Sequence, residues 1–251
     1  MEDYAIVLGA RGVGRLTATD YIEKMVPDFM ELHGDRLYGD DSAVVAGIGT
    51  LGTVPVTVIG IEKGKTTEER IRRNFGSAHP EGYRKALRLM KQAEKFGRPV
   101  ICLIDTAGAF CGIDAEERGQ GRAIADSLYE MADLRTPILS VVLGEGGSGG
   151  ALALAHSDRI FMTEDAYFSV VSPESCANIL WKTTERAGEA AEVLCLTADK
   201  LSRLGLIDRI CEKDNPRKLA SEISEELKIL AAMPTEALLE ARYRKFRNVG
   251  Y

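Results

Sequence analysis

Hydrophobic and polar positions follow two periods along the chain, one typical of strands and the other of helices. Runs of apolar, often β-branched residues predict strands over 43–48, 54–61, 100–104 and 138–143. Apolar residues recur at helical spacing over 21–32 and most clearly over 83–96, and further helices are expected over 115–134 and 151–156. Because the later strands are apolar throughout and alternate with helices, we expect a mostly parallel sheet that is covered on both faces.

The two ends of the chain depart from this pattern. Residues 1–20 mix glycine and arginine without a clear period, which predicts a loosely held N-terminal arm. Residues 21–251 contain no linker, repeat or low-complexity tract, so we expect a single domain there. Its C-terminal helices are expected from about residue 215, where Asn215-Pro216 is typical of a helix start, with Pro234 before a final helix over 236–247.

Composition narrows the class of protein. A chain of 251 residues with 45% hydrophobic residues can bury a large core without disulfides or metal. The net charge of −6 argues against nucleic-acid binding as the main function. The five cysteines are odd in number and none forms a CxxC pair, which predicts reduced thiols in a cytoplasmic protein and no zinc site. We find no signal peptide and no apolar run of about 18 residues, so no membrane partner is expected.

Two glycine motifs resemble nucleotide-binding sites but lack a necessary feature. The segment Gly60–Thr66 (GIEKGKT) has three residues between its glycines, where a phosphate-binding P-loop needs four. The segment Gly47–Gly52 (GIGTLG) matches a dinucleotide fingerprint, but a strand is predicted after it instead of the helix that would hold the pyrophosphate. Neither segment therefore predicts a nucleotide site.

A third glycine-rich segment, Gly144–Gly150 (GEGGSGG), lies between a predicted strand and a predicted helix. It also matches the dinucleotide fingerprint, but no suitable ribose-binding acid follows. It resembles a nucleophile elbow around Ser148, yet the later histidine that a triad needs, His156, would face away on the same helix. Backbone N–H groups at a helix start, without side chains in the way, can stabilise a developing oxyanion. We therefore predict that this segment forms an oxyanion hole or binds an anion. The alternative is that it is only a tight turn, which lets the helix pack on the sheet.

Several separate segments, in a fixed order, point to a known family. They are Leu32–Arg36, Arg73–Gly76 with His79–Ala86, Ala115–Gln120, Gly144–Gly150, and Ser172–Glu174 with Ile179–Lys182. Together they resemble the alpha subunits of acetyl-CoA carboxylase carboxyltransferases over about residues 20 to 210. Three loop positions depart from the usual residues of that family: Ala107 and Cys111 replace prolines, and Ser175 replaces glycine. These changes are expected to alter backbone stiffness or pocket shape.

The resemblance implies an α/β, crotonase-like fold, a spiral of ββα units with a C-terminal helical extension. It implies transfer of a carboxyl group from carboxybiotin, on the biotin carboxyl carrier protein, to acetyl-CoA, which gives malonyl-CoA for fatty acid synthesis. It further implies an active site shared with a zinc-bearing beta subunit in an alpha2beta2 assembly. We therefore expect no cofactor or metal on this chain.

The same resemblance suggests the site residues. The backbone N–H groups of Gly149 and Gly150 are predicted to form an oxyanion hole, and Gly108 and Ala109 the facing wall. The remaining predicted substrate contacts are Gly146, Gly147, Ser148, Lys63, Lys65 and Arg73. The three cations belong to a basic cluster with Arg70 and Arg72 that would meet the phosphates of CoA or an acidic partner; the alternative is a solvated helix face.

Three other functions compete with this interpretation. A different acyl-CoA enzyme of the crotonase-like fold, acting alone, would need a paired acid and base, and Leu152 is apolar where a hydratase would place a carboxylate. A Clp-like serine protease shares the fold and would use Ser148 with a helical histidine. A non-catalytic scaffold would bind an active partner and carry out no chemistry itself.

Overall fold

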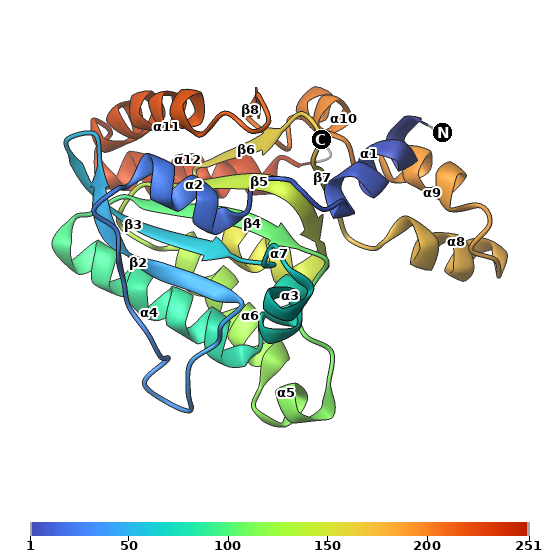
Figure 1. Cartoon of the computed structure of the whole chain (residues 1–251). Coiled ribbons are helices and arrows are strands. Elements are labelled where there is room, and N and C mark those ends of the chain that lie inside the picture. The colour runs from blue at the N-terminus through green and yellow to red at the C-terminus, as the bar shows by residue number, and fades with distance from the viewer. Residues whose placement is uncertain (1, 250–251) are drawn as a thin grey trace.

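One mixed sheet forms the centre of the molecule. A computed structural model describes residues 2–249, while Met1 and residues 250–251, at the ends of the predicted arm and domain, lie outside the described residues (Figure 1). The described strands are β1 (Met30–Glu31), β2 (Val44–Leu51), β3 (Val54–Ile61), β4 (Val100–Thr106), β5 (Ile138–Gly147), β6 (Arg159–Thr163), β7 (Tyr167–Ser169) and β8 (Arg209–Cys211). Their order is β1-β2-β3-β4-β5-β6-β8, with β7 also paired to β5. Strands β1 to β3 are antiparallel, and the pairs from β3 onwards are parallel.

Helices cover both faces of this sheet (Figure 1). On one face lie α4 (Pro80–Phe96), α6 (Gln120–Ala132) and α7 (Ser148–Ala155). On the other lie α2 (Ala18–Met25) and α11 (Pro216–Ala231), joined by Leu238 of α12 (Thr235–Arg247). Successive residues of β4 alternate between the two cores, because Cys102 and Ile104 belong to the first and Ile101 and Leu103 to the second. This double burial explains why the central strands are apolar throughout.

The shorter helices lie at the edges of the molecule. They are α1 (Glu2–Arg11), α3 (Thr67–Arg72), the 3-10 turn η1 (Asn74–Gly76), α5 (Ile113–Glu117), α8 (Pro173–Trp181), α9 (Ala187–Leu194) and α10 (Ala198–Arg203). Helices α8 and α9 form a hairpin that projects to one side, beside α1 (Figure 1).

The predicted elements are largely confirmed, with three corrections. The expected helix over 21–32 ends at Met25, because Pro27 restricts the residue before it, and Met30–Glu31 pairs with β2. The expected helix over 115–134 is two helices, α5 and α6, separated at Gly119 by its left-handed φ of 84°. Strand β5 continues through the glycine segment to Gly147 instead of ending at residue 143, because β7 pairs with its last residues.

The expectation of a loosely held arm is wrong for residues 2–20. Helix α1 buries Val7 and Ala10 against Tyr167 and neighbouring apolar residues, and α2 already begins at Ala18. Short-range periodicity missed α1 because only two of its residues are buried. The division of the chain into an arm and one domain stays a prediction.

Candidate active site

The glycine segment 144–150 divides between a strand and a helix. Glu145, Gly146 and Gly147 complete β5, and α7 begins at Ser148, so that Gly149 and Gly150 lie in its first turn. Ser148 has a left-handed φ of 53°, a conformation that is uncommon for a residue other than glycine. The chain therefore turns sharply from strand to helix, and the first N–H groups of α7 have no acceptor within the helix.

The predicted facing wall lies at the end of β4. Its last residue, Thr106, accepts a hydrogen bond from Gly108 N at 3.0 Å and donates one to the Gly108 carbonyl oxygen at 2.9 Å. These bonds fix the turn at Gly108, whose φ is 150°. Because the N–H of Gly108 is already bonded, Gly108 shapes the wall and has no amide donor left for a substrate.

The two predicted walls are in direct contact. A Cβ added at Gly150 would lie 2.4 Å from Ala109 N, and one added at Gly147 would lie 2.0 Å from the Ala107 carbonyl oxygen. Both distances are far below van der Waals contact, so only glycine at these two positions lets the turns meet. Gly149 differs, because a Cβ there would meet only Ile124 at 3.8 Å. The structure thus brings together Gly147, Gly150 and the Gly108–Ala109 turn, while the roles predicted for these residues stay predictions.

An apolar cavity of about 400 Å³ opens beside Gly149. Ser148, Gly149 and Leu152 form one wall of it, and Phe168 and Phe246 contribute from other elements. His156 stacks on Phe246 with ring centroids 4.0 Å apart, and burial lowers the pKa of His156 to about 4. Among the described residues, no hydrogen bond joins His156 to Ser148. The arrangement does not support a Ser-His nucleophile, and within residues 2–249 no acid or base lines this cavity.

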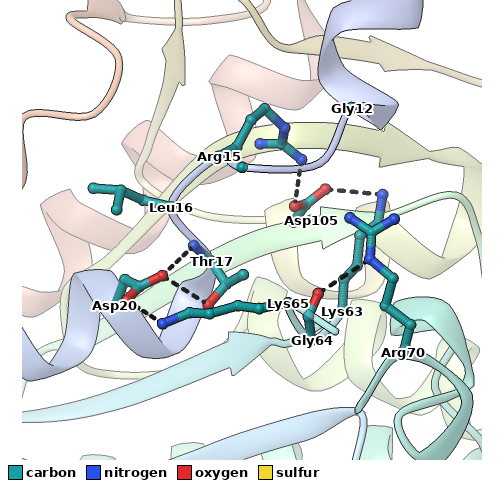
Figure 2. Close-up of a pocket in the computed structure, with 11 residues that line it drawn as sticks. Gly12, Arg15, Leu16, Thr17, Asp20, Lys63, Gly64, Lys65, Arg70 and Asp105 are labelled. Atoms are coloured by element: carbon teal, nitrogen blue, oxygen red, sulfur yellow. Dashed lines mark hydrogen bonds and ion pairs between the residues drawn. The ribbon is translucent and has the colours of Figure 1, made fainter. Parts of the chain in front are cut away.

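A buried acid pair lies just before the two walls. Asp105 accepts a hydrogen bond from Glu145 N at 2.9 Å, and the Lys63 ammonium contacts both carboxylates, at 3.2 Å from Asp105. Arg15 reaches the other oxygen of Asp105 at 2.8 Å, so Asp105 lies between two cations (Figure 2). Burial alone would raise the pKa of each carboxyl, but Lys63 and its neighbours hold both pKa values below the usual range.

Glu145 connects this pair to helix α1. Its carboxylate also accepts hydrogen bonds from Arg11 Nε at 3.0 Å and from the Tyr167 hydroxyl at 2.5 Å. Arg11 in turn donates to Glu174 at 2.6 Å. Sequence reasoning missed these residues as parts of the site. The signal in the sequence that could have identified Glu145 was its position as a single acid inside the glycine-rich segment 144–150, which has apolar residues on both sides.

The predicted basic cluster does not come together as a unit. Lys63 and Lys65 line a second cavity, of about 290 Å³, together with Arg15 and Arg70 (Figure 2). Lys65 pairs with Asp20 at 2.5 Å, and no carboxylate of the described chain lies within salt-bridge distance of Arg70. Arg73 does not line this cavity but donates to the Ser42 carbonyl oxygen at 2.7 Å.

The P-loop-like segment is part of the same cavity, but its backbone donors are occupied. Gly64 N donates to Glu62 at 2.6 Å, and Lys65 N donates to Glu69 at 2.8 Å. A phosphate would need these N–H groups, so the geometry agrees with the exclusion made from the glycine spacing.

Comparison with known proteins identifies the family. Residues 1–250 match the family model described as acetyl co-enzyme A carboxylase carboxyltransferase-like. The chain belongs to this family. A relative in Ruminiclostridium cellulolyticum is 53% identical over 256 residues, covering 100% of this chain and 98% of its own length. One in Streptococcus uberis is 54% identical over 255 residues, covering 99% and 100%. Both are named acetyl-coenzyme A carboxylase carboxyl transferase subunit alpha, which confirms the resemblance.

Solved structures confirm the crotonase-like carboxyltransferase fold. Transcarboxylase 12S, with hydrolyzed methylmalonyl-coenzyme A bound, has a TM-score of 0.76 at 20% identity and aligns with 93% of this chain. The chain spans 45% of that longer protein. A Pseudomonas malonate decarboxylase hetero-tetramer in complex with malonate gives a TM-score of 0.68 at 16% identity, covering 85% of this chain and 82% of the other. At these identities the similarity concerns the fold.

The three departures from the usual residues of the acetyl-CoA carboxylase carboxyltransferase family lie in different surroundings. Ala107 lies at the contact between the two turns, where its carbonyl oxygen faces Gly147. Cys111 is exposed beyond that turn, and Ser175 N donates to the Ser172 side chain that caps α8. Of the three, Ala107 is therefore the one placed to affect the site.

Residues 2–249 contain neither a candidate metal site nor a candidate membrane-spanning helix. No group of three or more His, Cys, Asp or Glu side chains in that range could hold a metal ion. Over the same residues, no helix has both the length and the apolar character that a membrane span requires.

Proposed function

We propose that this chain is the alpha subunit of an acetyl-CoA carboxylase carboxyltransferase, which transfers the carboxyl group of carboxybiotin to acetyl-CoA and forms malonyl-CoA. The observation that carries this proposal is the 53% identity to a named alpha subunit over 100% of the chain. The direct contact between the two predicted turns supports it, because the family resemblance placed both at the site.

The proposed chemistry needs stabilisation of negative charge more than it needs reactive side chains. Charge develops on the thioester oxygen of acetyl-CoA, as its enolate forms, and on the ureido oxygen of biotin. Backbone N–H groups of Gly149 and Gly150, at the positive end of α7, are proposed to stabilise one of these oxygens. Removing one such donor from an oxyanion hole typically lowers kcat by about 100-fold to 1,000-fold.

We favour the biotin oxygen for this subunit. The cavity beside Gly149 is apolar, which suits a compact bicyclic ring, and the beta subunit would then hold the thioester. The departing biotin nitrogen is proposed as the base for acetyl-CoA. That role fits the lining of the cavity, where the described residues offer no carboxylate or histidine.

The other predicted contacts take different roles in this proposal. Gly146 and Gly147 are buried in β5 and shape the turn, while Ser148 lines the apolar cavity. Lys65, with Arg70, is proposed to meet the phosphates of CoA or an acidic partner at the second cavity. Lys63 and Arg73 are less suited to that role, because Lys63 contacts two carboxylates and Arg73 bonds to a backbone oxygen.

We further propose that activity requires a beta subunit in an alpha2beta2 assembly in the cytoplasm. The biotin carboxyl carrier protein would deliver carboxybiotin, and zinc would be bound by the beta subunit. The relatives named as alpha subunits support a multi-subunit enzyme.

The decisive experiment measures malonyl-CoA formation from acetyl-CoA and carboxybiotin. The chain is assayed alone, then mixed with its beta subunit, and complex formation is checked by size-exclusion chromatography. Activity in the mixture alone is the expected result. A well-formed complex without activity would remove the assigned reaction and favour a non-catalytic scaffold, and activity of the chain alone would contradict the shared site.

A further inference from the structure

We propose that Asp105 and Glu145, bridged by Lys63, form a clamp that holds the two turns of the site in register, and that Glu145 is a positioning residue. This inference rests on the proposed function. The clamp is defined here as these three side chains. Its partners outside the clamp are Arg15 on Asp105, and Arg11 and Tyr167 on Glu145.

Each acid lies near the carboxyl end of its strand, just before one of the two turns. Asp105 is followed by Thr106 and the Gly108 turn, and Glu145 is followed by Gly146, Gly147 and the start of α7. Any movement of one acid relative to the other is therefore transmitted within a few residues to the contact between the turns. That contact tolerates little movement, because Gly147 and Gly150 approach the other turn so closely that only glycine fits at either position.

The sheet is irregular at the level of the two acids. Strands β4 and β5 pair regularly from Val100 to Ile104, and the register then shifts before Thr106 pairs with Gly146. Where the register shifts, Glu145 N donates to the side chain of Asp105. A carboxylate thus takes the place of a ladder acceptor, and the backbone ladder alone does not fix the ends of the two strands.

The electrostatics of the two acids favour a bridging cation. Two buried carboxylates that share one ammonium group repel each other, and the repulsion is strong where water is excluded. The side chains of Asp105 and Glu145 are only 3% and 7% exposed, and Lys63, at 11%, contacts both. Arg15 and Arg11 each neutralise one of the acids, but Lys63 is the cation that bridges the two.

At the apolar cavity the clamp acts through the turns and not on the ligand directly. Asp105 and Lys63 also line the charged cavity, where Lys63 is engaged by the two acids. Neither acid lines the apolar cavity beside Gly149, and the carboxylates of both acids already accept hydrogen bonds from protein donors. Glu145 and Lys63 are therefore positioning residues, and their loss should lower kcat more than it raises KM.

The first test uses Lys63→Met in the complex with the beta subunit. The single variant leaves the two acids without their bridge, so kcat should fall by about 10-fold or more while KM for acetyl-CoA changes by less than about 3-fold. Adding Glu145→Gln removes one of the two like charges. The double variant should therefore recover several-fold over Lys63→Met. An unchanged kcat in the single variant, or a double variant worse than the single, contradicts the clamp.

A matched control is the buried pair of Arg242 and Asp158, whose side chains are 0% and 2% exposed. Asp158 accepts a hydrogen bond from Ile138 N, so this pair lies at the opposite end of β5. Arg242→Met should lower the melting temperature but leave kcat of the folded complex within about 2-fold. An equal loss of kcat in Arg242→Met and Lys63→Met, at equal folded fraction, would show that the clamp contributes only to stability.

A second readout is independent of the reaction. Amide hydrogen exchange is measured on the full chain for the segments 106–110 and 146–152. Lys63→Met should speed exchange in both segments more than Arg242→Met does, even if the complex proves to catalyse no carboxyl transfer. Unchanged exchange in both segments would overturn the clamp while leaving the proposed function in place.

Discussion

Two cavities flank the carboxyl ends of β4 and β5, and they differ in chemistry. The cavity beside Gly149 is lined mainly by apolar side chains, and Ser148, Gly149 and Ser169 complete its lining. The cavity beside Asp105 is lined by charged side chains that mostly bond to one another. The comparison teaches that charged residues beside a site need not take part in its chemistry. In the roles proposed above, the charged side chains hold the backbone in place, and the apolar cavity presents the backbone donors.

The largest expected effect follows from the contact between the turns. Gly150→Ala would place a Cβ 2.4 Å from Ala109 N, a backbone atom that cannot move aside cheaply. We expect loss of activity by about 100-fold or more, with a lower melting temperature. The measurements are kcat in the beta-subunit complex and thermal unfolding of the chain.

Gly149→Ala is the matched control for this variant. Its Cβ would meet only Ile124 at 3.8 Å, and alanine favours the helix over glycine by about 1 kcal/mol. The melting temperature should therefore stay level or rise in Gly149→Ala, whereas it should fall in Gly150→Ala. An equal fall in melting temperature in both variants would show that the contact between the turns is not the reason why α7 requires glycine in its first turn.

The next prediction concerns the apolar side. Leu152→Asp introduces a charge into the lining of the cavity beside Gly149. The variant should raise KM for carboxybiotin by about 10-fold or more, because a bound ligand would bury the unpaired carboxylate, which is costly. Leu152→Met, of similar volume, should keep KM within about 2-fold. A normal KM in Leu152→Asp would place biotin elsewhere.

A smaller effect is expected on the charged side. Arg70→Ala removes a cation of the second cavity that has no carboxylate partner among residues 2–249, so KM for acetyl-CoA should rise by about 3-fold to 10-fold. The rise should shrink as salt increases, because ions screen such contacts. Arg73→Ala, outside this cavity, serves as control. Equal effects of Arg70→Ala and Arg73→Ala would argue against phosphate binding in the cavity.

The smallest expected effect is a pH dependence beside the apolar cavity. Burial, reinforced by Arg242, lowers the pKa of His156 from 6.5 to about 4 in the folded chain. The unfolded chain then binds more protons between these values, so the free energy of unfolding should fall as pH drops from about 6.5 to about 4. Chemical denaturation across this pH range should show that the free energy of unfolding falls less steeply in His156→Phe than in the unaltered protein. An identical slope in both proteins would exclude His156 as the cause.

The sequence predicted what depends on nearby residues. The strands, the helix α4 and the strand–turn–helix around Gly147 follow from periodicity and glycine placement over a few positions. The family resemblance then paired Gly150 with the Gly108 turn. The clamp was not predictable in this way, because Lys63 and Glu145 look like isolated charges until the sheet brings them together. The end of β5 was missed for a similar reason, since β7, which extends it, lies further along the chain.

The packing of α1 has a consequence for the order in which the chain folds. Arg11 bonds to Glu145 and Glu174, partners that lie 134 and 163 residues later in the sequence. During synthesis Arg11 therefore emerges well before its two acceptors exist. Closing so long a loop is slow and requires that β5 is already in place. Helix α1 is therefore expected to reach its final position late, after β5, which carries Glu145, has formed.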